Sequence, residues 1–279
     1  ATSPTAAVEP AQAAKSAVEL TDALERKVTF EAPPQKILIA GKATQLIVNT
    51  LYLFPEAKER VAHVEYRSQT KNLFLPLIDP LAKQKTDLER DAGPEQIAPL
   101  KPDVVLLKSY MQPNLGDPIE QLGIQVVYLD LETPEAFYRE VETLASLFGD
   151  EQRGEQIVEF YCSRAQALQI PLENISEDER PAVLILQYSK TGEEVAFSVP
   201  PVGYLQTRMT TAAGGAPVWS DVNASGGWTV VSFEQIAAWN PEMIFLVDYK
   251  GGAPEVVAGL AQNEQWASLP AMQAGKVFP

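Results

Sequence analysis

The sequence has a single cysteine, Cys162, and a single histidine, His63, among its 279 residues. One cysteine excludes an intramolecular disulfide and any cluster held by several thiolates. One histidine excludes the zinc and manganese sites that are built from several imidazoles. Both residues lie in regularly patterned segments, so we expect Cys162 to be a buried helix residue and His63 to be structural. The sequence therefore predicts no resident metal and no cofactor.

Basic residues and long apolar stretches are also scarce. There are 22 Lys and Arg against 37 Asp and Glu, which gives a net charge of −15. This charge disfavours nucleic acid and anionic lipid surfaces as partners. No apolar stretch approaches the roughly 20 residues that span a bilayer, and no signal peptide is visible. Residues 1–17 lack aromatics, Leu and Ile, so we expect a flexible tether there, with an ordinary frayed terminus as the alternative.

One phrase of the sequence occurs twice, as PEQIAPLKPDVVLL at Pro94–Leu107 and as FEQIAAWNPEMIFL at Phe233–Leu246. In both copies Glu-Gln-Ile-Ala leads to a Pro, an acidic residue and an apolar run. We expect a helix that ends just before the Pro, because the residue preceding Pro is pushed out of the α region, and a strand directly after it. The repeat predicts two halves with the same plan.

Short apolar runs alternate with helical patterns in both halves. The runs predict strands at Lys36–Ala40, Asp103–Leu107, Gln125–Leu129, Ala182–Gln187, Met243–Val247 and Lys276–Phe278. Helical patterns occupy Lys42–Leu53, Pro94–Leu100 and Phe233–Ala238. Nearly continuous apolar strands that alternate with helices are typical of buried parallel sheets.

A predominantly helical stretch, Thr133–Gln169, separates the halves. Pro134 suits a first helical turn and Gly149-Asp150 interrupts the pattern. The helix that follows, over about residues 151–168, has Ile157, Tyr161, Ala165 and Leu168 on one face. The predicted fold is therefore α/β, with two Rossmann-like lobes of mainly parallel sheet joined by one long interdomain helix. The expected divisions are a tether at 1–17, an N-terminal lobe at 18–132, a helical linker at 133–169 and a C-terminal lobe at 170–279. We expect the ligand in a cleft between the lobes.

Three stretches, in order, resemble a known family: TDALERKVTFEAPPQKILIAG (Thr21–Gly41), GPEQIAPLKPDVVL (Gly93–Leu106) and GGWTVVSFEQIAAWNPEMIFL (Gly226–Leu246). They resemble the substrate-binding proteins of ABC importers for iron–siderophores, haem and cobalamin, the class with a rigid interdomain helix. Glu25 stands where that family usually has a turn Gly. Family members also continue beyond the strand that corresponds to Lys276–Phe278, so the C-terminal lobe is expected to be truncated or completed differently.

The resemblance implies a role for the repeated phrase. In this family an acidic residue on each lobe docks into arginine pockets of the two permease subunits, and by position these residues are Glu95 and Glu234. Local helix chemistry is the alternative, because each Glu opens a helix where a carboxylate is favoured, and Ser232 with Gln235 has capping-box spacing.

Ligands of doubly wound sheets bind beyond the carboxyl ends of the strands. After the first strand, Gly41–Thr44 opens a helix, where backbone N–H groups could hold an anion. Tyr66, Tyr110, Tyr188 and Tyr249 each follow a strand with an Arg or Lys within two residues, and Tyr204 and Arg208 are expected to face the same opening. The candidate ligand residues are Tyr66, Arg67, Tyr110, Tyr188, Tyr204, Arg208, Trp228, Tyr249 and Lys250. Aromatic faces with cations suit a bulky, partly planar anion. The alternative is that the tyrosines pack the lobes and that Trp228 is a core residue.

Together with these residues, the resemblance implies a non-enzymatic, monomeric, extracytoplasmic receptor, in a periplasm or on a cell surface. It would capture a metal chelate, first of all a ferric siderophore, and deliver it to an ABC permease. Cobalamin, haem and oxyanions such as molybdate or tungstate are alternative ligands. Two other classes stay open: a chelatase that acts on tetrapyrroles, and an adaptor or sensor without a permease. Membrane contact is expected only through an N-terminal lipid anchor.

Overall fold

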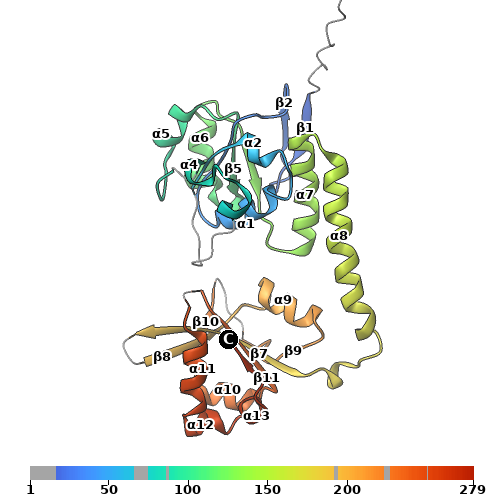
Figure 1. The fold of residues 1–279 in the computed structure, drawn as a ribbon, viewed down its shortest axis with the longest axis vertical. Coiled ribbons are helices and arrows are strands. Elements are labelled where there is room, and N and C mark those ends of the chain that lie inside the picture. The colour runs from blue at the N-terminus through green and yellow to red at the C-terminus, as the bar shows by residue number, and fades with distance from the viewer. Residues whose placement is uncertain (1–16, 66–74, 86–87, 192–193, 223–226, 250) are drawn as a thin grey trace, which may run out of the picture. The chain divides into compact units, whose positions relative to one another are not determined.

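The computed structural model describes residues 17–65, 75–85, 88–191, 194–222, 227–249 and 251–279. The chain forms two compact units. Unit 1 consists of Ala1–Tyr66, Lys83–Asp130 and Arg139–Glu155, and unit 2 of Arg67–Ala82, Leu131–Tyr138 and Gln156–Pro279. Each unit has its own β-sheet with helices packed around it (Figure 1). The α/β class with two lobes is confirmed, whereas the boundaries at 18–132, 133–169 and 170–279 stay a prediction.

The first half of the chain supplies a hairpin, a four-stranded sheet and several short helices. In chain order these elements are β1 (Val18–Thr21), β2 (Lys27–Phe30), β3 (Ile37–Ile39), α1 (Thr44–Leu51), α2 (Ala57–Arg60), β4 (Val61–Val64), α3 (Leu75–Ile78, in unit 2), α4 (Ala82–Lys85), α5 (Pro94–Ile97), η1 (Ala98–Leu100), β5 (Val104–Lys108), η2 (Ser109–Met111), the π-helix η3 (Gln112–Gly116), α6 (Asp117–Glu120) and β6 (Val126–Leu129).

The sheet of unit 1 has the order β4-β3-β5-β6, and all of its pairs are parallel. Every residue of β3, β5 and β6 is buried, as expected for a parallel sheet that is covered on both faces. The three strands predicted here are confirmed to within two residues at each end. His63 lies half-buried in β4, a strand that the sequence suggested but did not delimit.

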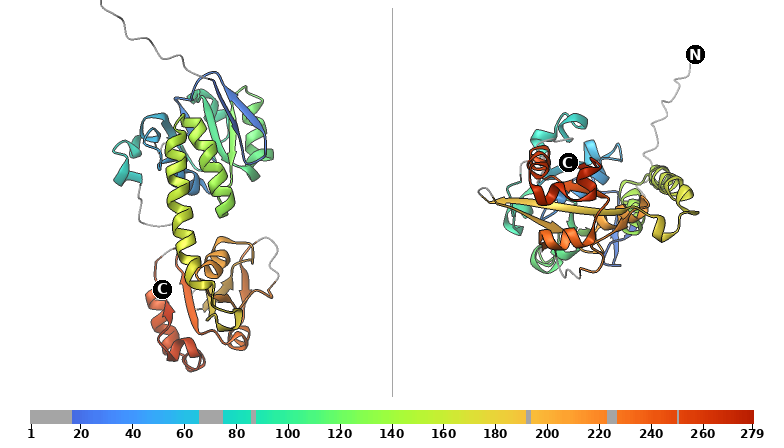
Figure 2. Two further views of the ribbon diagram at one scale, coloured as in Figure 1. Left: turned by 90° about the vertical axis from the view of Figure 1, so that its right-hand side faces the viewer. Right: turned by 90° about the horizontal axis from the view of Figure 1, so that it is seen from below.

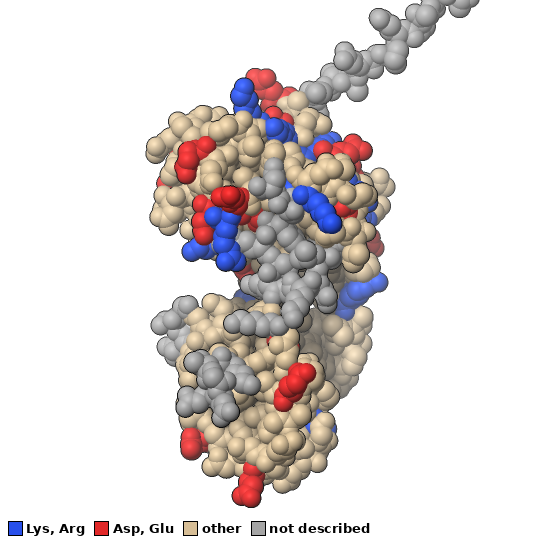
Figure 3. Space-filling model, turned by 60° about the vertical axis from the view of Figure 1, so that its left-hand side comes forward, with Lys and Arg blue, Asp and Glu red and all other residues tan. Residues whose placement is uncertain are grey.

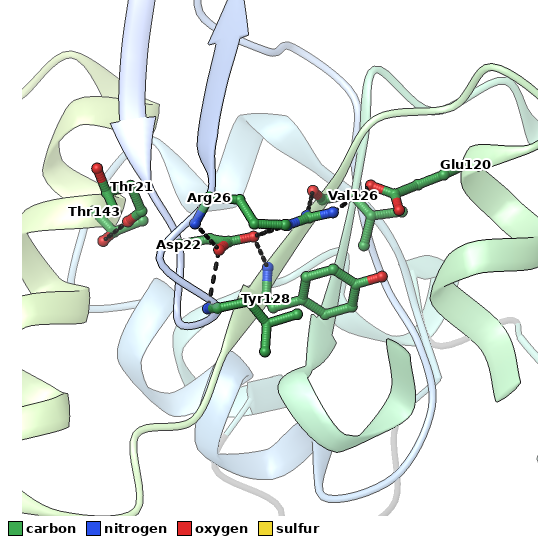
Figure 4. Close-up of polar contacts among 8 residues, drawn as sticks. Thr21, Asp22, Arg26, Glu120, Val126, Tyr128 and Thr143 are labelled. Atoms are coloured by element: carbon green, nitrogen blue, oxygen red, sulfur yellow. Dashed lines mark hydrogen bonds and ion pairs between the residues drawn. The ribbon is translucent and has the colours of Figure 1, made fainter. Parts of the chain in front are cut away.

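The N-terminal hairpin is held to unit 1 by Arg26. Glu25 has a φ of 61°, so it adopts the left-handed conformation that a turn Gly would take more readily. The Arg26 guanidinium bonds Asp22 Oδ2 at 2.8 and 2.9 Å and Glu120 Oε1 at 2.8 Å, and it lies 4.4 Å from the ring centroid of Tyr128 (Figure 4). Charge-assisted bonds of this kind attach β1 and β2 to α6 and β6.

The second half of the chain supplies two longer helices followed by the sheet of unit 2. Its elements are α7 (Pro134–Phe148), α8 (Glu151–Gln169), η4 (Ile170–Leu172), η5 (Glu177–Glu179), β7 (Ala182–Thr191), β8 (Glu194–Val199), α9 (Leu205–Ala212), β9 (Ala216–Pro217), β10 (Thr229–Val231), α10 (Phe233–Trp239), β11 (Met243–Val247), α11 (Ala253–Ala261), α12 (Glu264–Ala267), α13 (Pro270–Gln273) and β12 (Val277–Phe278).

The sheet of unit 2 is mixed rather than uniformly parallel. Its order is β10-β8-β7-β11-β12, with β9 also paired to β7. The β7–β11, β11–β12 and β7–β9 pairs are parallel, whereas β8 pairs antiparallel with both β7 and β10. Strand β8 was not predicted, and β7 continues four residues beyond its predicted end at Gln187. Polar residues in a long hairpin interrupt the apolar pattern, so periodicity alone did not reveal these strands.

Helices α7 and α8 lie side by side (Figures 1 and 2). Gly154 makes this possible, because an added Cβ would lie 2.6 Å from the Cβ of Ala145. The start of α7 at Pro134 and the break at Gly149, which has a φ of 72°, are confirmed. Helix α8 begins in unit 1 and continues into unit 2. Cys162 lies in α8 as expected, but it is half-buried rather than buried.

The two copies of the repeated phrase have the same local structure. In each a helix is followed by a left-handed residue, then by Pro, then by a central strand: Lys101 (φ 48°, ψ 58°) precedes β5 and Asn240 (φ 50°, ψ 55°) precedes β11. The prediction that the helix ends before Pro is confirmed. The mechanism is a left-handed helix C-cap rather than the extended conformation that usually precedes Pro.

Candidate ligand-binding site

In unit 1 the carboxyl end of β3 leads directly to the start of helix α1. Gly41 and Ala43 both have positive φ angles, 83° and 53°, directly before helix α1, and Lys42 between them is exposed. This places backbone N–H groups and one cation at the start of α1, as the sequence predicted for Gly41–Thr44. Tyr66 and Arg67, the candidate residues after β4, lie outside the described residues.

A buried carboxylate, Glu65, holds this edge of unit 1 together. Its Oε2 accepts a bond from Gly41 N and its Oε1 accepts one from Asp91 N, both at 2.8 Å. Its backbone carbonyl accepts a bond of 2.8 Å from the Thr44 hydroxyl. One side chain therefore fixes the loop before α1 and the segment that leads to α5. Nothing in the sequence pattern pointed to this role of Glu65.

Replacing Glu65 tests this role. In Glu65→Gln an amide N–H replaces one acceptor, so one of the two backbone N–H groups loses its bond inside a buried site. We expect a loss of about 1–2 kcal/mol in the free energy of unfolding, measured by urea denaturation. Glu59→Gln on the exposed surface of the same unit is the matched control, and equal effects of the two variants would contradict the role.

A second buried network lies at the ends of β5 and β6. The Lys108 ammonium donates to the carbonyl of Asp130, and Ser109 Oγ donates to Asp130 Oδ1 at 2.5 Å. Asp130 N in turn donates to Oε2 of the buried Glu140 at 2.6 Å. Lys108 is thus a structural cation. Tyr110, two residues on, is 53% exposed, and it remains a candidate contact for a ligand.

In unit 2 the loop after β11 is organised by Asp248. Its Oδ1 accepts bonds from the Tyr188 hydroxyl at 3.0 Å and from Gly251 N at 2.7 Å, and its Oδ2 accepts one from Ala253 N at 3.0 Å. Burial and the Asp248 carboxylate raise the pKa of Tyr188. Tyr188 lies inside β7 rather than after it, because β7 continues to Thr191. In the structure Tyr188 stabilises the loop after β11 through its hydrogen bond to Asp248.

Helix α9 brings other candidates to the same edge. Ala216, shortly after α9, pairs with Ala182 at the start of β7, so the first turn of α9 lies toward the opposite, carboxyl end of the strands. There Tyr204 is the N-cap of α9, and the Gln206 side chain hydrogen-bonds Tyr249. Burial is the main cause of the raised pKa of Tyr249, and the bond to Gln206 partly offsets it. No sequence signal pointed to Gln206.

Arg208 leaves α9 in another direction. Two residues along a helix correspond to about 200° of rotation, so Arg208 projects roughly opposite to Gln206. Its Nη1 bonds Glu135 Oε2 at 3.1 Å. The structure therefore brings Gln206 and Tyr249 together, and Asp248, the residue before Tyr249, accepts the bond from Tyr188 of β7. Arg208 projects away from Gln206, and Tyr204, four residues before Arg208, lies closer to the side of Arg208. Trp228 is half-buried directly before β10, and Lys250 lies outside the described residues.

The two candidate docking residues occupy equivalent places. Glu95 and Glu234 are exposed in the first turns of α5 and α10. Behind them, Gly93 N donates to Gln96 Oε1 and Ser232 N donates to Gln235 Oε1, each at 3.1 Å. Bonds from its own backbone N–H and from the Ser232 hydroxyl lower the pKa of Glu234. The predicted capping box of Ser232 and Gln235 is confirmed.

Comparison with known proteins identifies the family of this chain. Residues 49–279 match the family described as periplasmic binding protein. The chain belongs to this family. The match covers most of the chain, including both copies of the repeated phrase. It confirms the resemblance and shows that the chain is a substrate-binding protein of an ABC importer. Because this is a family of binding proteins, the expectation of a non-enzyme is confirmed and the chelatase alternative is set aside.

Individual relatives are distant in sequence. The molybdate-binding protein MolA of Haemophilus influenzae is 22% identical, over 93% of this chain and 76% of its own length. Its molybdate-bound structure has a TM-score of 0.69. A periplasmic solute binding protein of Veillonella parvula has a TM-score of 0.75 at 20% identity, over 94% of this chain and 78% of its own. FeuA of Bacillus subtilis, a triscatecholate siderophore binding protein solved with ferri-bacillibactin, has a TM-score of 0.63 at 17% identity, over 93% and 88%. At such identities the likeness establishes the fold.

The family places this binding protein outside the cytoplasm. None of the helices in the described part of the chain has the length and apolar character to cross a bilayer. Across the same residues, no three His, Cys, Asp or Glu side chains are grouped so that they could hold a metal ion. The protein therefore takes up a small solute and passes it to a permease, and the identity of the solute must come from the chemistry of its surfaces.

Proposed function

We propose that this periplasmic binding protein captures a bulky anionic metal chelate, a ferric siderophore in the first place, at the carboxyl ends of its strands. The proposal rests on a solvent-exposed apolar surface at the first turns of α9 and the loop before it. Val202, Tyr204, Leu205 and Met209 are all exposed there, in the segment that contains Gln206, the hydrogen-bond partner of Tyr249. An aromatic and apolar surface of this breadth favours a large ligand with planar groups.

The charge of unit 2 is compatible with such a ligand. On the face drawn in Figure 3 charged side chains are sparse on the lower body, which is unit 2, and denser on the upper one. The net charge of −15 therefore does not present a continuous acidic surface to an approaching anion there. In unit 1, Lys42 and the N-terminus of α1 offer a cation and backbone donors to an acidic ligand group.

Molybdate is a second candidate, because the curated relative MolA binds it. A small tetrahedral oxyanion needs several N–H and O–H donors. The start of α1 in unit 1 would offer the Lys42 ammonium and the backbone N–H groups of its first turn, since Gly41 N and the Thr44 hydroxyl already donate to Glu65. Tungstate would bind where molybdate does, whereas haem and cobalamin would bind where the chelate does. The two candidates therefore differ in which part of the protein senses the ligand.

A titration separates them. All four tryptophans, Trp219, Trp228, Trp239 and Trp266, belong to unit 2, so their fluorescence reports ligand binding at that unit. We expect saturable quenching by ferric enterobactin or ferrichrome at micromolar or lower concentration, checked by calorimetry at fixed salt. Tight binding of molybdate alone would contradict the chelate and support the second candidate. Silence toward both, with haem, cobalamin and tungstate also silent, would overturn the proposal.

Tyr249 gives the matching mutational test. We expect Tyr249→Ala to weaken chelate binding about tenfold, because stacking on an aromatic face is lost, whereas Tyr249→Phe retains most of the affinity. Tyr161→Ala, at another partly exposed tyrosine of unit 2 on α8, is the control. Affinity that is unchanged in Tyr249→Ala would remove this residue from the site.

Delivery is proposed to use Glu95 and Glu234. Both are exposed carboxylates at equivalent helix starts in the two units. Two equivalent contacts suit a permease of two like subunits, and carboxylate–arginine pairing is the strongest contact available to them.

A further inference from the structure

Unit 2 contains a groove of about 570 Å³ that adjoins the ligand surface described above, shares Val202 with it and is otherwise lined by other residues. It runs beside α9 and is lined by Pro134, Gln169, Leu172, Glu173, Arg180, Val202, Thr207, Arg208, Thr211, Ala212 and Pro217. Pro217 pairs with Val183 near the start of β7, so the groove reaches the amino ends of the strands. Arg208 enters it from the side of α9 roughly opposite to Gln206 and Tyr249.

Arg180 is the feature of the groove that points to a ligand. Its Nε is buried and has no hydrogen-bond partner among the described residues. A buried donor without an acceptor is costly, and it is unusual in a folded protein. A guanidinium presents Nε–H and a terminal N–H in parallel, which matches the two oxygens of a carboxylate. Arg180 lines the groove, so an anion bound beside the guanidinium would, after a small shift of the side chain, supply the acceptor that the described residues do not.

Arg208 adds a second cation to the lining of the groove. Arg208 pairs with Glu135 through one Nη1 bond of 3.1 Å between two largely exposed side chains. An exposed pair of this kind is weak, and a guanidinium has five N–H donors. Arg208 can therefore bond a bound anion while it keeps Glu135. The Thr207 and Thr211 hydroxyls already donate to backbone carbonyls of Pro201 and Thr207.

The rest of the lining fixes the class of ligand. Pro134, Leu172, Val202, Ala212 and Pro217 form apolar walls that would cover a hydrocarbon group. Glu173 in the lining and Glu135 beside Arg208 add negative charge, which opposes a second anionic group on the ligand. We infer that this groove binds a small amphipathic monocarboxylate, with its carboxylate on Arg180 and Arg208 and its aliphatic or aromatic part against the apolar walls.

The probe for this site is 4-fluorobenzoate, followed by ¹⁹F NMR on the full chain, with unlabelled benzoate and hexanoate as competitors. For a ligand of this size we expect a Kd of about 0.1–1 mM. Arg180→Gln should weaken binding at least tenfold, and Arg180→Lys should do so less. Arg164→Gln, which removes a charge from α8 in unit 2 at a residue that stacks on Phe160 and does not line the groove, should change nothing.

Three results would overturn the inference: no saturable binding of 4-fluorobenzoate by the parent protein, equal binding by Arg180→Gln, or equal weakening by Arg164→Gln. Thr211→Leu provides a second test that does not depend on Arg180, because Thr211 is exposed at the groove and the larger side chain should block the probe without disturbing the fold. Displacement of the probe by ferric enterobactin or molybdate would show one shared site, which would also contradict a separate groove. Failure here leaves the tryptophan titration of the solute unaffected.

Discussion

Reversal of the two carboxylates proposed for docking, Glu95→Arg with Glu234→Arg, is expected to abolish stimulation of the permease ATPase while the affinity for the solute stays unchanged. In the proposed docking, each substitution replaces an attraction to a permease arginine by a repulsion. Close charge pairs at interfaces can be worth about 1.5–7 kcal/mol each, so the loss of two should reduce the apparent affinity for the permease by more than 100-fold. ATPase activity of the reconstituted transporter, measured against binding-protein concentration, reports the effect.

The control for this experiment must reproduce the change in charge and the position at a helix start. Glu59 of α2 and Glu264 of α12 are exposed acidic residues in the first turns of helices, one in each unit. Glu59→Arg with Glu264→Arg should therefore leave stimulation close to that of the parent protein. If the control also abolishes stimulation, the effect is one of net charge and not of docking. If the Glu95 and Glu234 variant loses solute binding, the two residues do not act only in docking.

The second large effect is expected at Gly116, in the π-helix that follows β5. A Cβ at this position would lie 1.8 Å from Tyr128 Oη and 2.7 Å from Tyr128 Cζ. The Tyr128 side chain is fully buried, so the ring cannot move away without disturbing its neighbours in the core. We expect Gly116→Ala to lower the free energy of unfolding by about 3 kcal/mol, at the upper end for overpacking, measured by urea denaturation.

A double-mutant cycle isolates the cause. The Tyr128 hydroxyl is buried without a hydrogen-bond partner among the described residues, and burial raises its pKa. Tyr128→Phe should therefore cost little or be stabilising by up to about 1 kcal/mol. In the double variant the closest contact is gone, so the effect of Gly116→Ala should fall by about 1 kcal/mol or more. Additive effects would mean that Gly116 is needed for its backbone conformation and not for the space that it leaves to Tyr128.

The placement of Gly116 illustrates what a linear pattern cannot supply. The segment Gln112–Gly116 lies next to a well-predicted strand, yet nothing in QPNLG indicates a π-helix, and its contact with Tyr128 depends on how β6 packs. The same holds for Gln206 and Asp248, which support Tyr249 and Tyr188 from segments that are distant in sequence. Arg208 was expected to face the same opening as the candidate tyrosines. It lies in the first half of α9, and its side chain lines the groove that also contains Arg180.

The sequence by itself determined the α/β class, the two units, the parallel core strands, α7 and α8, and the repeated phrase with its paired glutamates. These depend on local properties: apolar runs, a Pro that ends a helix, and a Gly that breaks one. Only the tertiary structure decided which side chains meet. Tyr188 donates a hydrogen bond to Asp248, Lys108 belongs to a buried network, and Arg180 Nε has no hydrogen-bond partner among the residues that the structure describes. The physical reason is that burial and hydrogen bonding depend on distances between residues far apart in the chain, whereas helix and strand propensity depend on neighbours.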